Sequence, residues 1–108
     1  MTVIAADSDA VAALLATSLD QSFVALRTGT PGKLKPPVPG FREMLPASAT
    51  AMLDHMRQAS AIGGPTKVRA EMQRFIERTQ ADEIIVAGAI WDPAARHHSL
   101  RLTMAALA

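Results

Sequence analysis

One stretch of the chain constrains the fold more than any other: residues 60–92, "SAIGGPTKVRAEMQRFIERTQADEIIVAGAIWD". A short apolar run leads into Gly63 and Gly64, and Pro65 stands where the first residue of a helix tolerates a missing N–H. Apolar residues then recur at helical spacing. In a second run, at 84–90, successive residues are apolar instead of alternate ones, as expected for a strand that is covered on both faces. This order of strand, helix and strand predicts a parallel pair with a right-handed crossover.

The rest of the chain extends this α/β pattern. Residues 2–6 form another short apolar run, and a helix is predicted from Asp9 to Arg27 because apolar residues recur there at spacings of three and four. This stripe consists of Val11, Leu15, Leu19, Phe23 and Leu26. Further helices are predicted at 47–58 and from Pro93 onward. Four prolines and three glycines between residues 29 and 40 predict an extended loop. We therefore expect about three parallel strands, near 2–6, 59–62 and 83–90, and four helices.

Composition limits the number of domains and the classes of partner. A chain of 108 residues is expected to form a single domain, 1–108. Its net charge of +1 gives no basic field that would attract nucleic acid or an anionic membrane. No window approaches the roughly 18 uninterrupted apolar residues of a membrane span. The absence of cysteine fits a reducing compartment, so we expect a soluble cytoplasmic protein.

Several residues between the glycine turn and the C-terminal helix resemble the end of the luciferase-like flavin-dependent monooxygenases. Chains of that family close with a Gly-x-Pro turn, a Val-Arg helix, "TGADEL" or a near variant, an apolar strand, and "HDPAARLRSYELL". The matching residues here are Gly63, Pro65, Val68, Arg69, Thr79, Ala81, Asp82, Glu83, Asp92, Ala95, Arg96 and Ser99. The segment from Ile4 to Gly32 resembles the part that precedes them in the same family. The resemblance covers nearly the whole chain.

The resemblance implies a (β/α)8 barrel, which needs eight strands and about 250 residues. This chain would supply the sixth, seventh and eighth strands and would form a partial barrel-like unit. Each unpaired strand edge would need a partner. We therefore expect the sheet to be completed by oligomerisation, with a homodimer favoured through the sheet edge and the long first helix. A separately encoded barrel chain is the alternative.

The glycine turn and one tryptophan are the candidate binding residues. The resemblance implies FMN as cofactor, and amides at a helix N-terminus attract phosphate. Gly63, Gly64, Thr66 and Lys67 are the candidates for holding that phosphate, and Trp91 the candidate for lining a ring-binding pocket. The alternatives are a tight strand-to-helix turn for the glycines and ordinary packing for Trp91. Trp91 also stands where the family commonly has a histidine.

Other polar residues give weaker signals. His97 and His98 are neighbours on a helix and point about 100° apart, so they cannot share one metal ion, and no metal site is predicted. His55 with Asp54 or Glu43 would suggest acid–base chemistry, but no nucleophile accompanies them. The cations between Arg27 and Arg42 are accompanied by a single aromatic residue, and a solvated loop is favoured over a nucleic-acid groove.

Two classes of function remain open on these observations. In the first, the chain is part of a flavin-dependent oxidoreductase and contributes to a cofactor pocket, without catalytic competence as an isolated chain. In the second, it is a non-catalytic oligomeric protein derived from that family, with a structural or interaction role. The catalytic residues and the substrate are not predicted.

Overall fold

The computed structural model describes residues 1–30, 32–80 and 85–107. Its regular elements are β1 (Thr2–Ala5), α1 (Asp9–Arg27), the short 3-10 helix η1 (Arg42–Met44), α2 (Ala47–Met56), β2 (Ser60–Gly63), α3 (Pro65–Thr79) and α4 (Pro93–Leu107). The predicted mixed α/β class with four α-helices is confirmed. The described part of the loop at 29–40 contains no helix or strand, as its prolines and glycines predict.

The sheet is built around β1, which pairs in parallel with β2 in the register Thr2 to Ser60 through Ala5 to Gly63. The third predicted strand is only partly confirmed. Residues 83 and 84 lie outside the described residues, and in 85–90 only Ala87 forms a β-bridge, to Thr2. Two backbone bonds hold this bridge, from Val3 N to Ala87 O at 2.9 Å and from Ala87 N to Met1 O at 3.0 Å.

This arrangement corrects the predicted strand pairing. The segment 85–90 was expected beside β2, because α3 connects the two, but it lies on the opposite edge of β1. The order is therefore β2, β1, then 85–90. In a (β/α)8 barrel each strand pairs with the next one along the chain, so the described residues do not have barrel order. The reason is physical: a crossover connection fixes parallel direction, but does not require its two strands to be adjacent.

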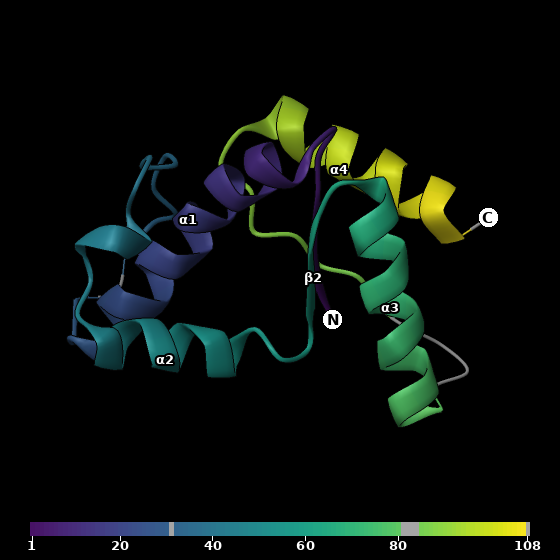
Figure 1. Cartoon of the computed structure of the whole chain (residues 1–108). Coiled ribbons are helices and arrows are strands. Elements are labelled where there is room, and N and C mark those ends of the chain that lie inside the picture. The colour runs from purple at the N-terminus through teal and green to yellow at the C-terminus, as the bar shows by residue number, and fades with distance from the viewer. Residues whose placement is uncertain (31, 81–84, 108) are drawn as a thin grey trace.

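Helices cover both faces of the sheet (Figure 1). One face packs Val3, Ala5 and Ala61 against Val68 and Met72 of α3, with Leu102 of α4 beside them. The other face packs Ile4 and Ile62 against the α1 residues Ala16 and Leu19, together with Ile90. A sheet with helices on both faces is an arrangement of doubly wound folds, whereas helices of a barrel lie on one face only.

The buried side of α1 matches the predicted stripe in part. Leu19 is buried, and Leu15 and Phe23 pack against the same cluster, whereas Val11 and Leu26 are exposed. The other buried positions are small or polar: Ala12, Ala16, Thr17, Ser18 and Asp20. Small residues let the helix approach the sheet closely.

Helix α1 also has the length and apolar composition of a membrane-crossing helix, and among the described residues it is the one helix that does. In this fold its Ala16 packs against the sheet, and Asp20 near its middle forms an ion pair with Arg57. Those are the properties of a core helix in a globular domain.

Candidate functional site

The predicted phosphate-binding residues lie where β2 ends and α3 begins. Gly63 ends β2, Gly64 is the N-cap of α3, and Thr66 and Lys67 are exposed in its first turn. Pro65 occupies the first helical position, as predicted. The sequence therefore predicted correctly that a strand turns into a helix at these glycines.

A carboxylate of the protein itself already lies at this turn. Asp9, the first residue of α1, accepts a hydrogen bond from the Gly64 amide with 2.6 Å between Asp9 Oδ1 and Gly64 N. A Cβ atom added at Gly63 would approach Asp9 Oδ1 to 2.9 Å and Lys67 Cδ to 2.7 Å. Glycine is thus required at residue 63 by this close approach. The side chain of Asp9 satisfies the α3 N-terminus in the way that an acidic cap does.

An acidic side chain of the protein lies at the turn predicted to hold the phosphate of FMN. A phosphate dianion that approached the Gly64 amide would meet the negative charge of Asp9 there. Lys67, the candidate cation, lies 4.0 Å from Glu71 through its Nζ and the Glu71 Oε1 atom. Two of the four predicted phosphate-binding residues, Gly64 and Lys67, therefore already have an acidic partner from this chain.

Trp91 lies between segment 85–90 and α4, with 48% of its surface exposed. It does not line the groove described below.

A polar pair joins Asp7, after β1, to His98 of α4, with 2.8 Å between Asp7 Oδ1 and His98 Nε2. His98 thus binds a carboxylate instead of sharing a ligand with His97. Within the described residues no group of three His, Asp or Glu side chains is placed to hold a metal ion.

An open groove of about 780 Å³ runs beside β2, between α1 and α3. Its floor includes Ser60 and Ile62 of β2, and Phe75 adds an aromatic wall from α3. The end near Gly64 carries Asp9, Lys67 and Glu71, whereas the opposite end carries Arg57, Arg74, Glu77 and Arg78. One end is therefore net negative and the other net positive.

The basic end of the groove is anchored by a buried ion pair. Arg57, which follows α2, donates from Nη2 to Oδ2 of the fully buried Asp20 at 2.6 Å. Burial raises the pKa of the Asp20 carboxyl above its ordinary value, and the Arg57 guanidinium partly offsets that rise. The second oxygen of Asp20, Oδ1, has no hydrogen-bond partner among the described residues. This pair ties α1 to the end of α2.

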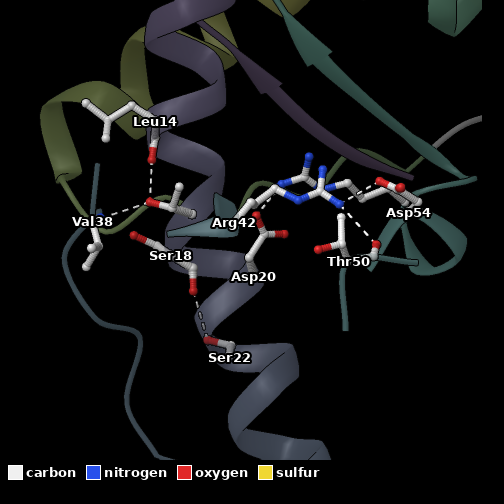
Figure 2. Close-up of polar contacts among 10 residues, drawn as sticks. Leu14, Ser18, Asp20, Ser22, Val38, Arg42, Thr50 and Asp54 are labelled. Atoms are coloured by element: carbon white, nitrogen blue, oxygen red, sulfur yellow. Dashed lines mark hydrogen bonds and ion pairs between the residues drawn. The ribbon is translucent and has the colours of Figure 1, made fainter. Parts of the chain in front are cut away.

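A second ion pair lies next to the first. Arg42 donates to Asp54 Oδ1 at 2.6 Å and to the Thr50 carbonyl at 3.1 Å, and Figure 2 shows both contacts with Asp20 of α1 nearby. Asp54 thus pairs with Arg42, and no hydrogen bond or ion pair of the described residues joins its side chain to His55. Figure 2 also shows the loop tied to α1, where the Val38 amide donates to Thr17 Oγ1 at 3.0 Å.

Sequence reasoning missed Asp9, Asp20 and Arg57 as interacting residues. The partners lie 55 residues apart in the pair of Asp9 with Gly64, and 37 apart in the pair of Asp20 with Arg57. One signal was available for Asp20: it stands in an apolar helix with no base three or four residues away, and a buried carboxylate needs a partner.

Known proteins with similar sequences cover most of this chain. It is 40% identical over 102 residues to the luciferase-like monooxygenase of Escherichia coli strain K12, and 38% identical over 102 residues to the uncharacterized protein YvbT of Bacillus subtilis strain 168. Each match covers 94% of this chain. The resemblance to luciferase-like monooxygenases is confirmed. The chain spans only about 30% of the length of these relatives.

A solved structure supports the fold. The chain aligns with the crystal structure of apo-MsnO8 at a TM-score of 0.75, with 23% identity, over 99% of this chain and 33% of that one. At this identity the likeness concerns the fold alone. No family model matches the chain.

Proposed function

We propose that this chain is a structural part of a luciferase-like, flavin-dependent monooxygenase and that, by itself, it neither holds FMN at the α3 turn nor catalyses oxidation. The resemblance over 94% of the chain supports the relationship. The length supports the limit on activity, because the chain corresponds to about 30% of those relatives. Cytoplasmic location and the absence of nucleic-acid and membrane partners remain part of this proposal.

The observation that carries the proposal is the bond between Asp9 and Gly64. This bond places a carboxylate of the chain on the amide of Gly64, one of the residues predicted to contact a flavin phosphate. The groove beside β2 also gives no support for catalysis: its one hydroxyl, Ser60, forms no side-chain hydrogen bond to a base among the described residues.

The test is a titration of the purified chain with FMN, followed by flavin fluorescence, and with inorganic phosphate, followed by the NMR shift of the Gly64 amide. The wild-type chain is expected to leave flavin fluorescence unchanged. Asp9→Asn removes one negative charge at the turn and is expected to bind phosphate about fivefold more tightly, because exposed charges at this distance interact by about 1 kcal/mol.

A stoichiometric FMN complex of the wild-type chain, abolished by Gly64→Asp, would overturn the proposal. Asp7→Asn is the matched control, because Asp7 is a nearby carboxylate that contacts His98 and not the turn. An equal gain in phosphate affinity in both variants would show that Asp9 has no special role.

A non-catalytic interaction role is the second candidate function. The observation that favours it is the groove beside β2, which exposes one edge of the sheet between two helices. An exposed sheet edge is a template for pairing with another chain.

A further inference from the structure

The free edge of β2 has a definite pattern of backbone groups. Thr2 N donates to Ala59 O at 3.3 Å, and Ala6 N donates to Gly63 O at 3.2 Å. Because hydrogen-bonding residues alternate along a strand, Ala59 and Gly63 face β1, and Ser60 and Ile62 face away from it. This outward side is the floor of the groove.

Carboxylates hold the outward donors of this edge. Ile62 N donates to Glu71 Oε2 at 3.2 Å, and Gly64 N donates to Asp9 Oδ1 at 2.6 Å. The Ser60 amide is engaged by the carbonyl of Arg57 at 3.0 Å, and the Gly64 carbonyl accepts from Val68 N. The carbonyl oxygens of Ser60 and Ile62 receive no hydrogen bond from any described residue. Two donors held only by side chains thus alternate with two free acceptors.

We propose that this edge pairs antiparallel with the same edge of a second copy of the chain, with Ile62 on the two-fold axis. In this register Ile62 N of each copy donates to Ile62 O of the other, and Gly64 N of each donates to Ser60 O of the other. Each donor that only a side chain holds meets a carbonyl that accepts no hydrogen bond from a described residue. The two groups that would otherwise pair across the axis, Ser60 N and Gly64 O, are those already engaged within one chain.

The charges of the groove favour the same direction. An antiparallel pair places the acidic end of one groove beside the basic end of the other. Asp9 and Glu71, released from the two amides, then face the partner's Arg74 and the partner's Arg78. A parallel pair would place like charges together. The antiparallel pair is an isologous two-fold contact, and it joins two short sheets into one.

The first measurement is the mass of the chain by size exclusion with light scattering at low micromolar concentration. The expected mass is twice 11.4 kDa, and a mass of 11.4 kDa overturns the proposal. The mass is measured without flavin or phosphate, because the Gly64 amide takes part in both tests. A mass of 11.4 kDa then overturns the dimer alone, and a stoichiometric FMN complex overturns the proposed function alone.

A cysteine placed on the axis tests the register. The chain has no cysteine of its own, and Ile62→Cys puts two thiols opposite each other across the two-fold axis. Under mild oxidation this variant is expected to run as a covalent dimer. The matched control Ser48→Cys, on an exposed position of α2, is expected to remain at 11.4 kDa. Equal cross-linking of both variants overturns the register.

A charge exchange tests the direction without altering the sheet. Arg78→Glu is expected to raise the dissociation constant of the dimer about tenfold, since it sets like charges against each other in two symmetric contacts. The double variant Arg78→Glu with Glu71→Arg restores opposite charges and is expected to recover most of the loss. Weakening without recovery in the double variant contradicts the antiparallel arrangement.

Discussion

Among the described residues, Asp20 is the one acidic side chain that is fully buried, which is unfavourable for its charge. It is fully buried, one oxygen binds Arg57 at 2.6 Å, and the other has no partner among the described residues. Its value to the fold comes from the link it makes between α1 and the end of α2. The attraction between the two charges of a buried ion pair roughly offsets the free energy of desolvating them, so the intact pair adds little stability. Removing one partner is strongly destabilising, because the other charge is then left buried without a partner.

We expect Asp20→Ala to lower the free energy of unfolding by about 3 kcal/mol, the low end for a broken buried pair, because Arg57 keeps 19% of its side chain exposed and remains partly hydrated. Asp20→Asn keeps an acceptor for Arg57 and should lose less. Urea denaturation at neutral pH measures both. Equal losses in the two variants would show that the acceptor and the packing kept by asparagine contribute little, and that the charge of Asp20 accounts for the whole effect.

The pH dependence of stability follows from the raised pKa of Asp20. In the window between its ordinary value of 3.8 and the higher native value, the folded state binds more protons than the unfolded state. The free energy of unfolding therefore falls as pH rises through this window. Asp20→Asn removes the titrating group, so the difference between wild type and variant should carry this negative slope. A difference that stays constant with pH would contradict the raised pKa.

The sequence predicted single residues well where their role is local. Gly63, Gly64 and Pro65 were recognised as a strand-to-helix turn because the conformation of a turn depends on a few consecutive residues. Asp9 and Asp20 were not recognised, because their partners come from other elements. Which side chain faces a given carboxylate depends on how those elements pack, and periodicity does not contain that information.

At the level of elements, α3 ends in a strained residue. Gln80 adopts a left-handed conformation, with φ 52° and ψ 37°, and its amide donates to the Ile76 carbonyl at 2.6 Å. Glycine is the residue usually found at such a helix end because it has no Cβ to clash.

We expect Gln80→Gly to raise the free energy of unfolding by about 0.5–1 kcal/mol. The left-handed conformation costs an L-residue about 1–2 kcal/mol, and glycine removes this cost. Glycine also has more conformational freedom in the unfolded chain, which offsets part of the stabilisation. Thermal or urea unfolding measures the change. Gln80→Ala keeps the Cβ atom and serves as the control, with no gain expected. A gain of the same size with alanine would place the strain elsewhere.

Element boundaries were predictable where one periodicity persists over several turns. Helix α1 spans the predicted residues 9–27, and the predicted helix at 47–58 is two residues longer than α2. The pairing of strands was not predictable, because the sequence of a strand as short as β1 or β2 does not indicate which other strand pairs with it. The segment 85–90 was expected beside β2 and lies beside β1 instead.

At the scale of the whole molecule, the order β2, β1, 85–90 leaves β2 at an edge of the sheet. Two small hydrophobic clusters, one on each face, form the core, and large apolar side chains such as Val11, Leu26 and Met104 remain exposed. A domain of about 100 residues buries a smaller share of its surface than a full barrel. Pairing through β2 would add backbone hydrogen bonds and contacts between two copies to this small core. Folding would then be coupled to association.

Coupled folding and association makes the melting temperature depend on protein concentration. A tenfold rise in concentration contributes about 1.4 kcal/mol per dimer. An unfolding entropy of about 2.1 cal/mol/K per residue amounts to about 0.45 kcal/mol/K for two chains, so the melting temperature should rise by about 3 °C per tenfold step. Calorimetry over a hundredfold range measures this shift. In Arg78→Glu the dependence should begin at higher concentration, because the weakened dimer dissociates before it unfolds. A wild-type melting temperature that stays constant over the whole range would mean that the fold is complete in one chain and that the β2 edge has no partner of its own kind.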